Sequence, residues 1–446
     1  MHPWLDCRGM RQTACLVWLM EKKHMDFDPI QFGARADGIT DDAPAIQAAI
    51  QACADAGGGR VILKSGKTFR SASLHLKSFV ELHLEAGSRL LASDRLEDYF
   101  RPDQPGNDGD ASNVGTPVTG KPSYVFLYAF GAEHAQITGA GVIDGCGTAF
   151  VRRVSPWYVT GDFYPRPTLI YVENCRHLTF RDTVMCNVSF WTLHMAGCED
   201  VLVDAIRILN PLDVANSDGI DVDHSRYVRI RDCHITCADD CVCMKNTLGN
   251  TEYPNTRGVI VSGCTLISTS AALKIGTEGV DDFEDILFTN CVIDASNRGL
   301  SVQVRDKGNV RHVVFDQILI RTRRFADSWW GCAEPIAVTA VDRSHAVPGG
   351  SIEDVRFSHI NCEGENGILL YGEKGRIRNI LMEDVNVRLV NTSRWPKDRY
   401  DLRPGEGMTV VEHPSVPMLC HGVEELEMRH VSLKDVQGKN CEPAFF

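Results

Sequence analysis

Five aspartates lie in two short segments, and their spacing is typical of acid–base chemistry. The segment "ANSDGIDVDHS" carries Asp218, Asp221 and Asp223, and the segment "CADDCVCMKN" carries Asp239 and Asp240. Carboxylates that converge on one surface repel each other and raise at least one pKa, which costs stability unless a function uses it. Hydrolysis of a glycosidic bond is such a function, because one carboxyl must be protonated while another is ionised. The alternative is that these residues only cap turns, as Asn and Asp often do.

A short phrase with apolar residues at alternate positions recurs along the chain and predicts the framework that holds these aspartates. Its nine copies end at Phe180, Val203, Ile230, Val261, Phe288, Phe315, Phe357, Met382 and Met428. Successive ends are 23, 27, 31, 27, 27, 42, 25 and 46 residues apart. Most spacings fit one turn of a solenoid, and the two long ones indicate turns with insertions. We therefore predict an all-β fold, a right-handed parallel β-helix, because a β-sandwich or a propeller has no reason to repeat this phrase at this period.

A second strand follows most copies of the phrase and locates the acidic residues. These strands read "GIDVDHS", "CVCMKN", "ALKIGTE", "GLSVQVRD", "PIAVTAV" and "GILLYGE". Asp218 and Asp240 precede the first two and are 22 residues apart, which is one turn. We expect both carboxylates at equivalent places on adjacent turns, with Asp239 beside them.

The remaining segments define the ends and walls of the solenoid. A helix is predicted over residues 42–56, with Asp41 and Asp42 at its start and one apolar face, and it is expected to cap the N-terminal end. Residues 1–25 are interpreted as an N-terminal extension without fixed structure, and residues 26–446 as a single β-helix catalytic domain. Loops that either wall a cleft or only cover the surface are expected at 99–122, 145–168, 323–335 and 390–418.

The composition excludes some classes of partner. The net charge of −13 argues against a nucleic-acid or anionic-membrane binder, since the mean field repels phosphate. No apolar segment approaches the length of a membrane span. The seventeen cysteines lack ligand-spaced Cys/His pairs, which favours buried free thiols over a metal site. Unpaired thiols suit a reducing compartment, so we expect a cytoplasmic location, with secretion as the alternative.

The segments "NSDGID" and "DDC", with this spacing, resemble the Asn-Thr-Asp and Asp-Asp signatures of glycoside hydrolase family 28, the polygalacturonases and rhamnogalacturonan hydrolases. The segments "FGARADGITDDAPAIQAAI" and "GAGVIDGCGTAF" are similar to the family's N-terminal cap and early turns. The resemblance spans residues 26–435. It implies a β-helix that hydrolyses a pectin-type bond with inversion and without a metal or other cofactor. By position, Asp239 resembles the general acid, and Asp218 and Asp240 resemble the residues that hold and activate water.

The chain also departs from the family pattern where polygalacturonases bind the substrate. Ala271 stands at the place of a histidine, and Ser301 and Gln303 fall in the segment that is Arg-Ile-Lys in those enzymes. An anionic sugar then requires other cations. The candidate substrate-binding residues are Asn216, Lys245, Lys274, Gln303 and Arg305, with Lys274 as the best candidate for a uronic carboxylate. Trp329, Trp330 and Tyr371 are candidates for stacking on sugars, with ordinary packing as the alternative.

The preferred hypothesis is a glycosidase that cleaves galacturonic-acid-containing poly- or oligosaccharides and acts from chain ends. Extra loops that close one end of the groove would favour chain-end action. A rhamnogalacturonan hydrolase, or another glycosidase that releases uronic acid or rhamnose, is the nearest alternative. Alternatives of other classes are a calcium-dependent polysaccharide lyase and a carbohydrate-binding solenoid without activity. The expected partner is a pectic carbohydrate, and the sequence does not predict an oligomeric state.

Overall fold

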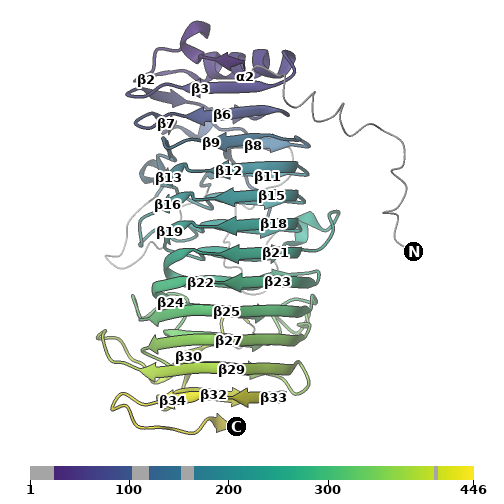
Figure 1. Ribbon diagram of the computed structural model, residues 1–446, viewed down its shortest axis with the longest axis vertical. Coiled ribbons are helices and arrows are strands. Elements are labelled where there is room, and N and C mark those ends of the chain that lie inside the picture. The colour runs from purple at the N-terminus through teal and green to yellow at the C-terminus, as the bar shows by residue number, and fades with distance from the viewer. Residues whose placement is uncertain (1–24, 103–119, 152–164, 406–409, 446) are drawn as a thin grey trace, which may run out of the picture.

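The protein is a right-handed parallel β-helix, as the repeat predicts (Figure 1). The computed structural model describes residues 25–102, 120–151, 165–405 and 410–445. Within them, 33 strands join one continuous sheet, from β1 to β35. Apart from Met25, the predicted N-terminal extension lies outside the described residues. Each full turn contributes to three parallel stacks of strands.

The first stack carries the recurring phrase. Its strands are β1 (Asp26–Phe27), β3 (Gly59–Leu63), β6 (Val80–Leu84), β9 (Gln136–Thr138), β12 (Arg176–Arg181), β15 (Glu199–Asp204), β18 (Arg226–Arg231), β21 (Arg257–Ser262), β23 (Phe283–Thr289), β25 (Val310–Thr322), β27 (Ile352–Gly364), β29 (Ile377–Leu389) and β33 (Val423–Arg429). The ends of all nine copies pair in register, from Phe180 with Val203 to Met382 with Met428. The two long spacings are therefore insertions that leave the stacking intact.

The second stack continues each turn around a corner. It holds β2 (Asp37–Asp41), β4 (Thr68–Ser71), β7 (Arg89–Ala92), β10 (Val142–Asp144), β13 (Val184–Cys186), β16 (Arg207–Leu209), β19 (His234–Cys237), the first parts of β22 (Thr265–Gly279) and β24 (Val292–Val304), the last parts of β25, β27 and β29, and β34 (Ser432–Lys434). The corner residue adopts a left-handed conformation in most turns, for example in Asp232, Gly263 and Asn290. Gly, Asn and Asp tolerate this conformation best, which explains their frequency between the strands.

The third stack carries the predicted second strands. It holds β5 (Leu74–His75), β8 (Val125–Phe130), β11 (Thr168–Glu173), β14 (Leu193–Ala196), β17 (Ile220–Asp223), β20 (Val242–Asn246), the last parts of β22 and β24, β26 (Glu334–Ala340), β28 (Ile368–Gly372), β32 (Met418–His421) and β35 (Ala444–Phe445). Outside the stacks, β30 (Arg399–Asp401) pairs antiparallel with β31 (Val410–Glu412). Short 3-10 helices span Pro29–Phe32, Leu96–Asp98, Gly147–Ala149 and Leu248–Asn250.

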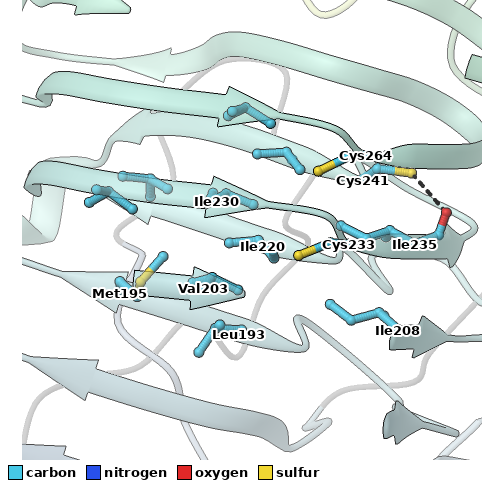
Figure 2. Packing of buried hydrophobic residues seen from close by; sticks show 14 of the residues in the cluster. Leu193, Met195, Val203, Ile208, Ile220, Ile230, Cys233, Ile235, Cys241 and Cys264 are labelled. Atoms are coloured by element: carbon cyan, nitrogen blue, oxygen red, sulfur yellow. Dashed lines mark hydrogen bonds between the residues drawn. The ribbon is translucent and has the colours of Figure 1, made fainter. Parts of the chain in front are cut away.

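Inward-pointing side chains of the three stacks form one continuous apolar core. Figure 2 shows Val203 and Ile230 of the first stack near Leu193 and Ile220 of the third, and all four are fully buried. Phe288, Phe315 and Phe357 stack face to face along the first stack. Fifteen cysteines lie in the described residues, and all of them are free thiols. Because each turn repeats this inward face, the outward face is free to vary.

The predicted capping helix is α2 (Ala43–Asp55), and it covers the N-terminal end of the coil (Figure 1). Its predicted apolar face is buried. Asp41 Oδ1 accepts a hydrogen bond from Ala43 N at 3.1 Å, whereas the Asp42 carboxylate binds Arg35 N and Ala36 N. Asp41 is thus the aspartate that bonds the helix start. No helix in the described part of the chain is long and apolar enough to cross a membrane.

Candidate functional site

Three carboxylates converge at the start of two neighbouring strands of the third stack. Asp218 precedes β17, and Asp239 and Asp240 precede β20. Gly219 N donates to Asp240 O at 2.8 Å, which joins the two turns directly beside the carboxylates. A Cβ atom on Gly219 would lie 2.4 Å from the carbonyl oxygen of Cys241, so only glycine permits this approach. One carboxylate oxygen from each of the three aspartates lies within 4.8 Å of the others.

Burial makes the chemistry of these carboxyls unusual. Asp218, Asp239 and Asp240 are 2%, 5% and 1% exposed. Burial, and then the negative charge of Asp240, raises the pKa of Asp239 to about 7. Burial and the charge of Asp239 raise the pKa of Asp218 well above its ordinary value. The cluster therefore retains protons under conditions in which exposed aspartates are ionised.

The partners of the three carboxyls differ. Asp240 Oδ2 accepts from Lys274 Nζ at 2.7 Å, and its Oδ1 accepts from Ser270 Oγ at 3.0 Å. Asp239 Oδ2 accepts from the backbone N–H of Asn216 at 3.3 Å. Asp218 Oδ1 is buried without a hydrogen-bond partner. The Lys274 ammonium thus occupies one oxygen of Asp240, whereas Asp218 has an oxygen left for a ligand or a water molecule.

A second group of charges lies beside the aspartates. Lys245 Nζ lies 3.1 Å from Glu278 Oε2, 3.7 Å from Asp221 Oδ1 and 4.8 Å from the centre of the Trp191 ring. Burial alone would raise the pKa of Glu278, but Lys245 and the neighbouring Arg343 lower it to about 2. Burial raises the pKa of Asp221 well above its ordinary value. Glu278 is therefore a permanent anion that holds Lys245 in place.

These residues line a cleft with a cavity volume of about 50 Å³, which is room for several water molecules. Its lining comprises Trp191, Asn216, Asp218, Asp239, Asp240, Lys245, Lys274, Thr277, Glu278, Arg298, Gln303, Trp330, Arg343, Arg403 and Pro404. Residues on or beside third-stack strands of six successive turns, from β14 to β26, thus meet the loop residues Arg403 and Pro404, which are distant in sequence.

Four of the five predicted substrate-binding residues line this cleft, namely Asn216, Lys245, Lys274 and Gln303. Gln303 Nε2 is buried there without a hydrogen-bond partner, so it has a donor available for a ligand. Lys274 Nζ is bonded to Asp240 Oδ2 at 2.7 Å, and its contact with a substrate carboxylate stays a prediction.

The prediction for Arg305 is wrong. Its side chain is fully buried and donates to the backbone carbonyls of Leu402 and Pro404, at 3.1 and 2.5 Å. It therefore binds a loop of its own chain and does not line the cleft. Of the aromatic candidates, only Trp330 lines the cleft; Trp329 donates to Ala238 O, and Tyr371 stacks on His421.

Sequence reasoning missed several residues of the cleft, and these are Trp191, Thr277, Glu278, Arg298, Arg343, Arg403 and Pro404. Glu278 stands in the second-strand segment "ALKIGTE", so its position on the outward face of β22 was an available signal. Arg298 and Arg403 meet through Asp401, which is 103 residues from Arg298 in the chain. No local spacing reports such a contact.

Each cation that lines the cleft has a carboxylate partner among the described residues. Arg298 lies 3.1 Å from Asp401, and Arg343 lies 2.6 Å from Asp306. Among the described residues, one group of at least three His, Cys, Asp or Glu side chains has ligand atoms close enough to hold a metal ion, and it is Asp218, Asp239 and Asp240. The ammonium of Lys274 already occupies an oxygen of Asp240, and Lys245 adds a second nearby positive charge. This donor set therefore fits proton transfer better than a divalent cation.

Comparison with known proteins agrees with this geometry. Residues 118–396 match the model of glycosyl hydrolases family 28. A probable polygalacturonase of Vitis vinifera is 26% identical over 311 residues, covering 67% of this chain and 61% of that protein. An endo-polygalacturonase of Pectobacterium carotovorum is 24% identical over 365 residues, covering 78% and 84%. The chain spans about 60% of the length of the first curated relatives that it matches.

Solved structures show the same fold. An exopolygalacturonase from Thermotoga maritima has a TM-score of 0.66 and 20% identity, covering 82% of this chain and 88% of that one. A family 28 exopolygalacturonase from Yersinia enterocolitica has a TM-score of 0.67 and 18% identity, covering 94% and 80%. With the family model matched over more than half of the residues, the chain belongs to glycosyl hydrolases family 28.

Proposed function

We propose that the protein is a glycosidase that hydrolyses pectin-type, galacturonic-acid-containing oligo- or polysaccharides from chain ends. The observation that carries this proposal is the contrast between two adjacent carboxyls. Asp239 has a pKa raised to about 7, and Asp240 is bonded to the ammonium of Lys274. One proton donor and one anion in the same cleft are what glycoside hydrolysis requires.

In the proposed mechanism, protonated Asp239 donates its proton to the oxygen that leaves the sugar. Asp240, which Lys274 and Ser270 hold, accepts a proton from the water that attacks the anomeric carbon. Asp218 orients that water through its unpartnered oxygen. The glycosidic bond breaks, the leaving oxygen receives the proton of Asp239, and the sugar receives hydroxide.

We propose inversion of configuration on the basis of family membership. One oxygen of each carboxylate lies within 4.8 Å of the others, and the carboxyl groups of inverting enzymes are typically separated by roughly 6.5–9.5 Å. NMR of the first-formed anomer is expected to show inversion, and retention would mean that a carboxylate attacks the sugar.

The substrate class is supported by relatives named as a probable polygalacturonase and an endo-polygalacturonase, and by a probable endo-xylogalacturonan hydrolase of Aspergillus niger. Every cation that lines the cleft in the described part of the chain is already paired with a carboxylate. A rhamnogalacturonan substrate, or another uronic-acid or rhamnose-releasing activity, is therefore the second candidate. Chain-end action is supported by the loop residues Arg403 and Pro404 in the cleft lining.

A reducing-sugar screen tests the function. The purified protein is incubated with homogalacturonan, xylogalacturonan and rhamnogalacturonan, with the Asp239→Asn protein as control. New reducing ends without ultraviolet-absorbing unsaturated sugars, and without inhibition by a chelator, are expected. Unsaturated products that vanish with a chelator would indicate a calcium-dependent lyase. Sugar binding without any new reducing ends would indicate a binding protein.

We propose that the protein works in a reducing compartment, with the cytoplasm as the expected location. The free thiols of the described residues support this, because disulfides form and persist in oxidising compartments. Cell fractionation with an antibody to the protein tests it, and recovery from the culture medium would contradict it.

A further inference from the structure

On the C-terminal side of the three aspartates, outward-pointing residues of the third stack become covered by another segment of the chain. Gln303 on β24, Thr339 on β26 and Tyr371 on β28 occupy equivalent positions on successive turns. Gln303 lines the cleft, but Thr339 does not, and its side chain is fully buried with an unpartnered Oγ1. An outward residue of a solenoid is buried only where another segment covers it.

The covering segment is Arg399–Pro404, which includes β30. Tyr400 and Leu402 are 1% and 2% exposed and pack against Leu369 and Leu419, the outward residues of β28 and β32. Arg403 and Pro404 then continue into the cleft lining. The segment therefore lies over the third stack on the C-terminal side of the three aspartates.

Buried charges hold this segment in place. The Asp401 carboxylate is 3.1 Å from Arg298 Nη2, and it accepts hydrogen bonds from Gly331 N at 2.7 Å and from Arg403 Nε at 2.8 Å. Arg298 itself belongs to β24. The removal of one partner from such a buried pair is strongly destabilising, because the other charge then lies unpaired. The Asp401 side chain therefore attaches the segment to Arg298 on the wall of the cleft, and it also orients Arg403.

Arg305, which directly follows the last residue of β24, provides a second attachment for the segment Arg399–Pro404. It donates to Leu402 O and Pro404 O and, from the strand side, to Thr339 O at 3.2 Å. Arg403 remains 28% exposed, lies over the ring of Trp330 at 5.2 Å and lines the same cleft as the three aspartates. Arg399 and Arg403 are the two partly exposed residues of an otherwise buried segment, and of these two Arg403 lines the cleft.

We infer that Arg399–Pro404 is the closed end of the cleft and that Arg403 contacts the terminal sugar there, so that the segment limits the enzyme to chain ends. This inference rests on the proposed function. A closed end places the last sugar of a chain against Arg403 and Trp330, and the rest of the chain leaves on the opposite side of the aspartates. Arg403 is then a specificity-determining residue, and Asp401, Arg298 and Arg305 position it.

Binding stoichiometry tests the closed end without hydrolysis. The Asp239→Asn protein is titrated by calorimetry with homogalacturonan fractions of defined length. One protein bound per chain, whatever the chain length, is the expected result. A number of bound proteins that grows with chain length overturns the inference and leaves the proposed function intact. Absence of both binding and cleavage contradicts the proposed function and the inference together.

Product analysis tests the role of Arg403. The wild type is expected to release only products of one short length from end-labelled homogalacturonan. Arg403→Ala is expected to shift products to greater length, because the closed end then has room for a further sugar. Arg399→Ala is the matched control, since this arginine lies on the same segment with 24% of its side chain exposed but does not line the cleft. Identical product lengths for the two variants would overturn the assignment of Arg403.

Discussion

The outward faces of the first and third stacks carry similar charges in different surroundings. On the first stack, Arg231 binds both oxygens of Asp204, and the two side chains are 50% and 14% exposed. On the third stack, Lys274 binds Asp240, and the two side chains are 11% and 2% exposed. The hydrogen bonds of Arg231 lower the pKa of Asp204, whereas burial raises that of Asp239 to about 7. The same helical repeat therefore carries solvated ion pairs on one face and, on the other, buried carboxyls of which Asp239 has a raised pKa.

Covering segments account for this difference. Outward residues of β18 alternate with buried ones and face solvent, while every residue of β20 is buried. Loops that lie over the third stack remove water from its charges, and desolvation then disfavours the ionised carboxyl. Function in this fold thus depends on what covers a strand as much as on the strand itself.

The first prediction concerns the acid. Asp239→Asn keeps the size of the side chain but cannot protonate the leaving oxygen, so kcat should fall by about 10²–10⁴-fold. Reducing-end assays measure the loss, and circular dichroism checks the fold. Asp204→Asn, on the solvated face, is the control and should retain full activity. An Asp239→Asn enzyme with near-normal kcat would remove Asp239 as the acid.

The second prediction concerns the buried ion pair. Lys274→Met leaves Asp240 without its ammonium, and a hydrogen bond to a charged group contributes about 1.5–3 kcal/mol, so kcat should fall by about 10- to 100-fold. Burial by itself would lower the pKa of Lys274, but the charge of Asp240 raises that pKa above its ordinary value. The ammonium is therefore present at every pH at which the enzyme is assayed. Arg231→Met is the matched control on the solvated face.

Substrate chemistry separates two roles of Lys274. If it acts through Asp240, the loss is the same on galacturonan and on its methyl ester. If it contacts the substrate carboxylate, as expected from the sequence, the loss shrinks on the esterified polymer. Full activity of Lys274→Met on both polymers would contradict either role.

The third prediction is a pH dependence. Asp239 must be protonated to act as an acid, and its pKa is about 7, so kcat/KM should fall by about tenfold per pH unit above that value. Because the folded state raises this pKa above its ordinary value of 3.8, the folded state binds the proton more tightly. The Asp239 carboxyl therefore makes its full contribution to the free energy of unfolding at low pH, and that contribution is lost as pH rises towards 7.

Thermal unfolding checks the same carboxyl without substrate. Asp239→Asn should gain stability relative to the wild type between pH 5 and pH 8, since the variant has no buried charge to form. If the difference in Tm between Asp239→Asn and the wild type is the same at pH 5 and at pH 8, Asp239 is ionised throughout this range.

The sequence predicts the fold well because the repeat is a property of the inward face. All nine ends of the phrase pair in register, from Phe180 to Met428. The convergence of Asp218 and Asp240 follows from the same period, although the chemical roles of both remain predictions. Nothing in that period predicts which outward residues are covered.

Arg305 illustrates the limit. Strand alternation indicates that it leaves the core, but the segment that buries it comes about a hundred residues later. Arg403 was missed for the same reason, since it reaches the cleft only because Asp401 meets Arg298. Contacts between inserted loops and the solenoid depend on long-range packing, and the local pattern of residues does not encode them.

The last prediction has the smallest effect and concerns the solvated face alone. Removal of the Arg231–Asp204 pair, by Arg231→Met, Asp204→Asn or both, should leave kcat unchanged and alter the free energy of unfolding by little more than the error of denaturant titration. Exposed pairs contribute little, because water solvates both charges and salt screens them. A double-mutant cycle at low and high salt measures the coupling, which should disappear at high salt. A coupling that persists in salt, or a loss of activity as large as that of Lys274→Met, would mean that burial does not distinguish the two faces.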